Sequence, residues 1–399
     1  MRAVVFHGIG DVRLDEVKDP EIREPTDAIV RITRSAICGT DLHFVRGTVP
    51  GMKAGTVLGH EAVGVVEEVG KGVRNFQEGD RVVVPSTIAC GNCVPCKRGF
   101  FAQCDRANPN GPEAGTAFYG GPQLSGPFDG LQAERQRIAL AHVNLVKLPD
   151  EVSDDQAILV SDIFPTGWFG TSLADVAPGT SVAVFGCGPV GQFAIASAFL
   201  RGAARVIAVD AKRDRLEAAR AQGAECIDYE ADDPVKAVKE LTAGSGVDAV
   251  IDAVGVDANA PRSAPREAKK KGKAEAKEVA PEQRPHDGNW HPGDAPSQAL
   301  AWGVEVVCKA GTLAVIGVYP PTARAFPIGQ AMNKNLSVKM GNCNHRKYIP
   351  LLLERVRTGA IDPSRVVTQE HPLESAIEAY QQFDQREPGW LKVEILPAH

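Results

Sequence analysis

The spacing of hydrophobic positions changes partway along this chain. Up to about residue 155, short runs rich in Val and Ile alternate with Gly, Pro and Asp, which is typical of β-strands joined by tight turns. We expect these strands at residues 1–6, 28–35, 62–69 and 81–85. The repeated glycines between the third and fourth runs suit the connections of a β-barrel.

From residue 181 the pattern becomes an alternation of apolar strands and amphipathic helices. Strands are expected at residues 182–185, 206–210, 226–228, 247–254 and 312–318, and helices at 190–200, 213–221, 234–241 and 296–309. Apolar strands that alternate with helices indicate a parallel sheet covered on both faces. The sequence therefore predicts an α/β protein with a β-rich domain over 1–160, a doubly wound domain over 161–320, and a return to the first domain over 321–399.

One segment interrupts this alternation, as an insertion at about residues 257–295. Residues 262–285 are rich in Pro, Ala, Lys and Glu and stand where a short connection is normal. One interpretation is a solvated, partly disordered insertion. The other is a flap that touches the adenosine end of a cofactor or a neighbouring subunit.

Composition and net charge exclude several classes of function for this chain. It has 399 residues, of which 43% are hydrophobic and 24% charged, as expected for two domains of a soluble globular protein. A net charge of −6 gives no support to binding of nucleic acid or a membrane surface. The first residues resemble a strand rather than an export signal, and no apolar run approaches the roughly 20 residues of a membrane span. We expect a cytoplasmic protein with no membrane or nucleic-acid partner.

Four cysteines share one loop. Cys90, Cys93, Cys96 and Cys104 have the spacing C-x2-C-x2-C-x7-C, which lets four thiolates face one centre. Four cysteine ligands leave no open coordination position, as in structural zinc sites. An iron–sulfur cluster is the alternative interpretation.

A glycine-rich turn follows the first strand of the second domain. It contains Gly186, Gly188, Pro189, Val190 and Gly191 and opens a predicted helix, which is the context of a dinucleotide-binding fingerprint. The first glycine allows the tight turn, the second allows the pyrophosphate to approach, and the third allows close packing of helix on strand. The phosphates are expected at the helix N-terminus.

The cofactor is expected to be NAD. Asp210 ends the next strand, where its carboxylate can accept hydrogen bonds from the ribose hydroxyls and would repel a 2′-phosphate. Lys212, Arg213 and Arg215 follow closely and weaken that discrimination, and we include Arg215 among the cofactor-binding residues.

A third set of candidate residues is dispersed. Cys38 and His60 could supply two ligands of a catalytic zinc, which takes three protein ligands and keeps one open position. Asp162, near the change from β-rich to α/β sequence, is the candidate third ligand. A single His beside a strand is more often structural, and local sequence alone favours a helix cap for Asp162.

These motifs resemble the zinc-dependent medium-chain alcohol dehydrogenases along the whole chain. The resemblance rests on the segments 38–43 (CGTDLH) and 59–61 (GHE), the four-cysteine loop and the glycine-rich turn. The segments 161–167 (SDIFPTG) and 292–298 (PGDAPSQ) look more specifically like the formaldehyde-dehydrogenase subgroup, in which Asp replaces Cys as third zinc ligand. The resemblance implies a GroES-like β-barrel catalytic domain, a Rossmann domain, two zinc ions per chain, and Asp162 as a ligand.

The resemblance also implies roles for other residues. Thr40 would accept the substrate proton, which could pass through the nicotinamide ribose to His43. Glu61 resembles a carboxylate that approaches the zinc during ligand exchange, although an ordinary carboxylate behind the site is an equal alternative. Positions that meet the nicotinamide in relatives correspond here to Thr166, Val190, Gly317 and Val318.

The leading hypothesis is an NAD-dependent alcohol dehydrogenase that acts on a small alcohol or hydrated aldehyde. Alternatives within the class are a formaldehyde dehydrogenase, a polyol or amino-alcohol dehydrogenase, and an aldehyde dismutase that holds NAD tightly. A non-catalytic NAD-binding protein is a different class, and five intact candidate residues argue against it. The resemblance implies a homo-oligomer, with a tetramer favoured over a dimer.

Overall fold

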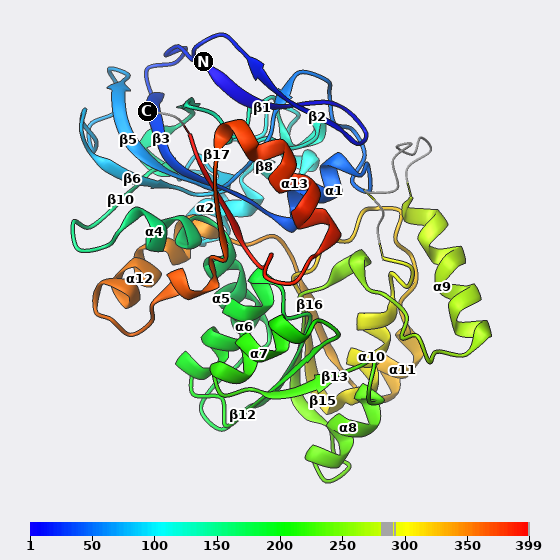
Figure 1. Ribbon diagram of the computed structural model, residues 1–399. Coiled ribbons are helices and arrows are strands. Elements are labelled where there is room, and N and C mark those ends of the chain that lie inside the picture. Colours follow the sequence, from blue (N-terminus) through cyan, green and yellow to red (C-terminus); the bar gives the residue numbers. More distant parts are fainter. Residues whose placement is uncertain (281–289, 291–292, 398–399) are drawn as a thin grey trace. The chain divides into compact units, whose positions relative to one another are not determined.

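The computed structural model describes residues 1–280, 290 and 293–397, which divide into two units (Figure 1). Unit 1 comprises residues 1–165, Trp290 and residues 342–397, whereas unit 2 comprises residues 166–280 and 293–341. The chain therefore leaves its first unit, builds the second, and returns. Among the helices of these residues, none combines the length and apolar character that a membrane span requires.

Unit 1 is mainly antiparallel β-structure. Its largest sheet, as far as the described residues show, follows the order β10-β6-β5-β3-β18-β17, and β9 also pairs with β3. Smaller sheets follow the orders β2-β1-β4 and β7-β8. The strands are β1 (Arg2–Gly8), β2 (Asp11–Glu16), β3 (Ala28–Ile37), β4 (Thr56–Val57), β5 (Ala62–Val69), β6 (Arg81–Val84), β7 (Thr87–Ile88), β8 (Ala117–Phe118), β9 (Arg135–Ile138), β10 (Val146–Lys147), β17 (Gln369–Pro372) and β18 (Val393–Leu396).

The sheets of unit 1 enclose an apolar core. Val30 and Ile32 of β3 pack with Val66 of β5 and with Val82 and Val84 of β6, and all five are buried. These residues come from three of the Val- and Ile-rich runs that the sequence pattern predicted as strands. The helices of this unit are α1 (Gly39–Val45), α2 (Val94–Lys97), α3 (Ala141–Asn144), α4 (Asp154–Ser161), α12 (His345–Arg357) and α13 (Ala376–Gln385), with α5 (Ile163–Leu173) leading from unit 1 into unit 2.

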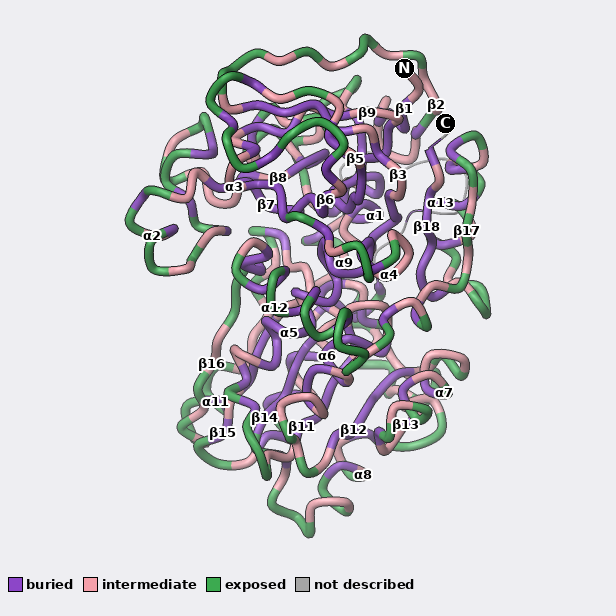
Figure 2. Tube along the Cα trace, turned by 90° about the vertical axis from the view of Figure 1, so that its left-hand side faces the viewer, coloured by how far each residue is buried: buried purple, intermediate pink, exposed green. Residues whose placement is uncertain are grey.

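Unit 2 is a doubly wound parallel sheet. Its strand order in the described residues is β13-β12-β11-β14-β15-β16, which is the order 3-2-1-4-5-6 of a Rossmann fold. The central strands β11, β12 and β14 are buried along most of their length (Figure 2). The elements are β11 (Ser181–Phe185), α6 (Pro189–Leu200), β12 (Arg205–Asp210), α7 (Arg213–Ala221), β13 (Glu225–Asp228), α8 (Pro234–Leu241), β14 (Val247–Asp252), α9 (Arg266–Val279), α10 (Gln298–Val306), β15 (Val307–Val315), α11 (Ile328–Asn333) and β16 (Ser337–Met340). The predicted fold class, a GroES-like β-barrel domain with a Rossmann domain, is confirmed.

The structure corrects the predicted helix over residues 296–309. Helix α10 ends at Val306, and β15 begins at Val307, so residues 307–309 are strand. The β-branched Val306 and Val307 favour extended backbone, and Val307 pairs with Val247 of β14. The strand predicted over residues 312–318 is β15, which begins earlier, at Val307, and ends earlier, at Val315.

The sequence predicted that the chain returns to the first domain at residue 321. In the structure unit 2 continues beyond that residue and includes one more strand of the Rossmann sheet, β16. Strand β16, SVKM, pairs in parallel with β15, and unit 2 extends to Gly341. This strand lies at the sheet edge and no residue in it is fully buried. It therefore lacks the apolar run by which buried parallel strands are recognised.

Part of the insertion, for which a partly disordered segment and a flap were the two alternatives, is an ordered helix. Residues 266–279 form α9, a 14-residue helix built largely from the strong helix formers Ala, Lys and Glu. Gly272 and Val279 are its buried positions, and a Cβ at Gly272 would lie 2.5 Å from the carbonyl oxygen of Asp294. Close packing on residues 294–295 therefore holds the helix. Residues 281–285 of the predicted insertion lie outside the described residues.

Candidate metal centres and nucleotide-binding loop

Four potential metal ligands from separate segments converge in unit 1. Cys38 directly precedes α1, His60 and Glu61 directly precede β5, and Asp162 lies between α4 and α5. All four side chains are buried, and one ligand atom from each lies within 4.8 Å of the others. We call these residues the buried cluster. It contains the three predicted ligands of the catalytic zinc.

His60 sits between two carboxylates. Its Nδ1 lies 3.0 Å from Asp41 Oδ1, and its Nε2 lies 3.0 Å from Asp162 Oδ2. Neither nitrogen makes a well-aligned hydrogen bond within the described part of the chain, although both are fully buried. Burial disfavours the imidazolium, but Asp41, Cys38 and Asp162 outweigh it and raise the pKa of His60 well above its usual value. The surroundings of this imidazole therefore favour a positive charge, which suits a divalent cation bound at Nε2.

Asp162 is shared between two histidines. Its Oδ2 faces His60, and its Oδ1 accepts a hydrogen bond of 2.7 Å from Nε2 of His345, the first residue of α12. Burial disfavours the carboxylate, but His345 and His60 hold the pKa of Asp162 well below its usual range. Asp162 is thus kept ionised, as a metal ligand must be.

Glu61 is neutralised from the far end of the chain. The Nζ of Lys392 donates to both carboxylate oxygens, at 2.8 and 2.6 Å, and to the carbonyl oxygen of Ile37 at 3.0 Å. Both side chains are fully buried. Burial alone would lower the pKa of Lys392, but Glu61 outweighs burial and raises it. Burial also raises the pKa of Glu61, and Lys392 opposes that rise, so the two contacts at 2.8 and 2.6 Å favour an ion pair. Glu61 therefore offers less free charge to a metal than Asp162 does.

Helix α1 carries the two residues of the predicted proton relay. Asp41 Oδ2 accepts the backbone N–H of Cys38 at 2.9 Å, and this capping interaction fixes the start of the helix beside the buried cluster. Thr40 is half-buried, and His43 is buried three residues further along. Positions three apart share one face of a helix, so the two side chains lie on the same side.

The four-cysteine loop forms the second ligand group of unit 1. Cys90, Cys93, Cys96 and Cys104 bring their sulfurs within 4.8 Å of one another, and the 3.8 Å between Cys93 Sγ and Cys104 Sγ is far longer than a disulfide bond. Sulfurs bound at about 2.3 Å to one tetrahedral zinc lie about 3.8 Å apart. We call this group the cysteine loop.

Backbone amides point at sulfurs of the cysteine loop, although burial raises the pKa of Cys96 and Cys104. The N–H groups of Cys90 and Ala107 point at Cys104 Sγ, at 3.2 and 3.3 Å. Burial would raise the pKa of Cys93, but backbone hydrogen bonds from Cys96 and Asp105 lower it to about 7. The donor set therefore fits a structural zinc.

The glycine-rich turn of unit 2 has the geometry of a dinucleotide-binding loop. Gly186 has φ +85°, and a Cβ at Gly191 would lie 1.8 Å from the carbonyl oxygen of Gly186. At Gly188, the N-cap of α6, a Cβ would meet only Arg215 Nη1, at 3.7 Å. Packing within the chain thus explains why residue 191 must be glycine. It does not explain the glycine at residue 188, where the space beside the backbone is open to an approaching ligand.

Asp210 is tied to this turn. Its Oδ2 accepts the backbone N–H of Cys187 at 2.7 Å, and its Oδ1 accepts those of Ala211 and Lys212 at 2.7 and 2.9 Å. These bonds use three of about four acceptor positions of a carboxylate. One position is left for a ribose hydroxyl.

The remaining predicted cofactor residues lie at the ends of their elements. Pro189 and Val190 open α6, and Gly317 and Val318 follow β15. A Cβ at Gly317 would lie 2.2 Å from Gly255 N, so this glycine also has a packing role. Thr166 is in α5 and begins unit 2.

Sequence reasoning missed three residues around the buried cluster: Asp41, His345 and Lys392. Asp41 lies inside the segment 38–43, where a carboxylate close to the candidate ligand Cys38 was a usable signal. His345 and Lys392 are 183 and 331 residues from the side chains they contact, and nothing in their own segments indicates those contacts.

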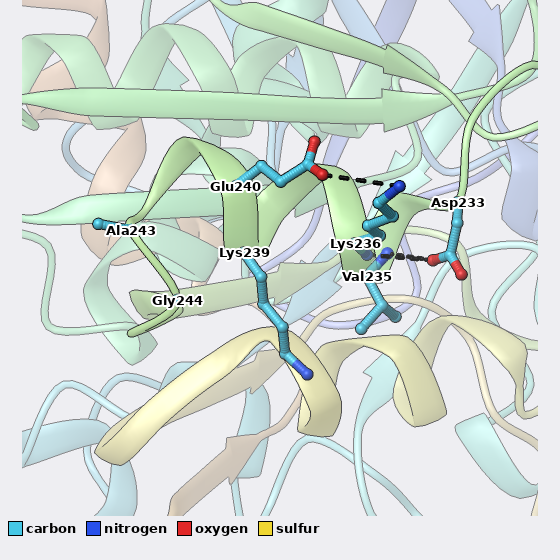
Figure 3. Close-up of a pocket in the computed structure, with 7 residues that line it drawn as sticks. All are labelled: Asp233, Val235, Lys236, Lys239, Glu240, Ala243 and Gly244. Atoms are coloured by element: carbon cyan, nitrogen blue, oxygen red, sulfur yellow. Dashed lines mark hydrogen bonds and ion pairs between the residues drawn. The ribbon is translucent and has the colours of Figure 1, made fainter.

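A groove of about 550 Å³ lies along α8, lined by Asp233, Val235, Lys236, Lys239, Glu240, Ala243 and Gly244 (Figure 3). Asp233 caps the helix by accepting the N–H groups of Val235 and Lys236. Lys236 pairs with Glu240 at 3.7 Å. Contacts that stabilise α8 therefore explain the charged residues Asp233, Lys236 and Glu240 of the groove.

Comparison with known proteins agrees with this geometry. Family models described as "Alcohol dehydrogenase GroES-like domain" and "Zinc-binding dehydrogenase" match residues 24–150 and 189–274. An uncharacterized zinc-type alcohol dehydrogenase-like protein of Bacillus subtilis is 37% identical over all of both chains. A glutathione-independent formaldehyde dehydrogenase of Pseudomonas aeruginosa is 40% identical over 64% of this chain and 66% of its own length. The solved alcohol dehydrogenase of Thermus sp. ATN1 has a TM-score of 0.82 and 35% identity over all of both chains. The chain therefore belongs to the zinc-type alcohol dehydrogenase family.

Proposed function

We propose that this protein transfers a hydride between NAD and a small alcohol or hydrated aldehyde, in either direction, with zinc held by Cys38, His60 and Asp162. The buried cluster carries the proposal. It offers a thiolate, an imidazole and a carboxylate at one point, and the buried nitrogens of His60 make no well-aligned hydrogen bond within the described residues. Three protein ligands are what a catalytic zinc uses, with a fourth position for water or substrate.

Zinc bound there would polarise the substrate oxygen and lower the pKa of the substrate hydroxyl. Residues of α1 can transfer the substrate proton. The Thr40 hydroxyl can accept the proton from the substrate while it donates its own hydroxyl proton, and His43, on the same face of α1, can receive the donated proton. Lys392 keeps the negative charge of Glu61 balanced behind the cluster.

NAD is proposed over NADP because of Asp210. Its carboxylate has one acceptor position left for a ribose hydroxyl, and its negative charge disfavours a 2′-phosphate. An Asp210→Ala variant should lose affinity for NAD and gain activity with NADP. If it gains no NADP activity, Asp210 does not have this role.

For the substrate, we propose the formaldehyde-dehydrogenase type. The segment SDIFPTG with Asp162 supports this choice, as does the 40% identity to the formaldehyde dehydrogenase of Pseudomonas aeruginosa over part of its length. A polyol or amino-alcohol dehydrogenase is an alternative that would differ in its substrate pocket. An aldehyde dismutase is another, which would hold NAD through each turnover.

The test is NADH formation by the purified protein with formaldehyde, ethanol, benzyl alcohol and polyols, together with zinc analysis. We expect two zinc ions per chain and turnover of at least one small alcohol or aldehyde, with Asp162→Ala as the inactive control. One zinc per chain would contradict the proposed catalytic site. Aldehyde dismutation without added NAD would identify the dismutase alternative.

A further inference from the structure

His345 joins three distant segments at the buried cluster. Its Nε2 lies 2.7 Å from Asp162 Oδ1, and its Nδ1 lies 3.2 Å from Oγ1 of Thr87 in β7. His345 is only 3% exposed, and Thr87 and Asp162 are also buried. Both ring nitrogens of a buried imidazole thus have a partner in the same unit.

The two partners determine the direction of the hydrogen bonds. The Asp162 carboxylate can only accept, so His345 Nε2 carries a proton and donates it. In the neutral ring Nδ1 is then an acceptor, and the Thr87 hydroxyl donates to it. In the imidazolium both nitrogens donate and the Thr87 hydroxyl accepts, so Nε2 donates to Asp162 in either form of the ring.

This arrangement treats the two oxygens of Asp162 differently. Oδ2 faces His60 Nε2 at 3.0 Å, on the side of the buried cluster, whereas Oδ1 is bonded to His345. A thiolate offers a single donor atom, but a carboxylate can bind a metal through one oxygen or both. Binding through both would fill the coordination position that a catalytic zinc keeps open.

We propose that His345 is a positioning residue that keeps Asp162 a one-oxygen metal ligand and so keeps the fourth coordination position free for substrate. This inference rests on the proposed function, because it assumes that Asp162 binds the zinc. Thr87 supports the role of His345, because its hydrogen bond to Nδ1 holds the neutral ring in the tautomer that donates through Nε2.

The experiment compares the wild-type protein with His345→Ala, His345→Gln and His345→Asn. The amide of Gln can place an N–H near the position of Nε2, whereas the shorter Asn reaches only the position of Nδ1. His7→Ala is the matched control, because His7 Nε2 also lies 2.7 Å from a carboxylate, that of Asp15, away from the candidate metal ligands. The proteins are loaded with zinc or with cobalt(II), and the visible spectrum, zinc loss to a chelator, kcat and KM are measured.

We expect His345→Ala to lose the zinc of the buried cluster about 10–100-fold more readily. The cobalt(II) spectrum should weaken toward that of a five-coordinate ion, since Oδ1 becomes free to bind. KM should rise together with a fall in kcat. His345→Gln should restore the spectrum, whereas His345→Asn should not, and His7→Ala should match the wild type. The cysteine loop contributes equally to all spectra and cancels in their differences.

The outcomes separate the two proposals. If the wild type binds two zinc ions and His345→Ala keeps its spectrum and zinc affinity, the positioning role is wrong while the proposed function stands. If the wild type binds only one zinc, both are wrong. If His345→Ala does not fold, the Gln and Asn variants decide, because equal spectra for those two would contradict the role.

Discussion

The two candidate zinc sites of unit 1 are built in opposite ways. The cysteine loop takes all its ligands from residues 90–104, and backbone amides of the same loop point at its sulfurs. The buried cluster takes its ligands from residues 38–162, and its supporting side chains come from as far as Lys392. A loop that carries its own ligands and hydrogen bonds needs few contacts elsewhere. A dispersed site works only when the whole unit has folded around it.

This contrast predicts that the two sites fail differently. Loss of a loop ligand should destabilise the fold, because the zinc there holds together a segment with few apolar side chains. Loss of a ligand in the buried cluster should chiefly remove activity. The predictions below test this separation.

The largest expected effect is on catalysis. Asp162→Ala should lower kcat/KM by at least about 10³-fold, because several kcal/mol of transition-state stabilisation depend on the metal. Zinc content should fall from two ions to one, with a change in Tm of only a few degrees. Steady-state kinetics and metal analysis check this, and a variant that keeps both zinc ions and its activity would contradict the ligand assignment.

Cys96→Ser should show the opposite pattern. We expect a loss of more than about 4 kcal/mol in the free energy of unfolding, as for other losses of a structural metal. The molecules that remain folded should keep kcat within a few-fold of the wild type. Denaturant unfolding alongside active-site titration measures both. Cys308→Ser, which changes a half-buried cysteine in β15 outside either ligand group, is the control.

The ion pair between Lys392, near the end of the chain, and Glu61 of the buried cluster gives a third test. Lys392→Met leaves Glu61 buried without its cation, which should lower stability by about 3 kcal/mol. The double variant Lys392→Met with Glu61→Met should recover most of that loss, since an apolar pair replaces an ion pair of similar volume. Thermal unfolding of the wild type, the single variants Lys392→Met and Glu61→Met, and the double variant forms a double-mutant cycle. Additive losses would mean that the two residues are not coupled.

The same contrast explains what the sequence could predict. The cysteine loop, the glycine turn and Asp210 are recognisable because their chemistry lies in one short segment with fixed spacing. The α/β class and the doubly wound parallel sheet followed from hydrophobic periodicity, whereas the GroES-like domain came from the family resemblance. Strand β16 was not predicted, because an edge strand with no fully buried residue has no apolar run. His345 and Lys392 could not be predicted, since their roles arise only when β-strands and helices bring distant residues together. Asp162 needed the family resemblance, because a local reading favoured a helix cap.

Glu394 gives the clearest contrast with Glu61, and its effect depends on pH. Glu61 has Lys392 on both oxygens, whereas the buried oxygens of Glu394 make no hydrogen bond within the described residues, and Arg34 lies 3.6 Å away. Burial, together with the charge of Asp155, raises the pKa of Glu394 to about 8. In the unfolded chain its pKa is about 4.3. A group whose pKa rises on folding opposes folding increasingly as pH increases between these two values.

Glu394→Gln should therefore change stability in a pH-dependent way. Glutamine has no proton to lose, so the variant should match the wild type near pH 4, where the carboxyl is protonated in the folded state and mostly protonated in the unfolded chain. Near pH 9 the variant should be more stable by several kcal/mol, since a pKa that rises from about 4.3 to about 8 on folding corresponds to about 5 kcal/mol. Other titrating groups cancel in the difference between the two proteins. Denaturant unfolding at both pH values measures it, and an equal difference at pH 4 and pH 9 would show that Glu394 does not titrate as an unsupported buried carboxyl, which would remove its contrast with Glu61.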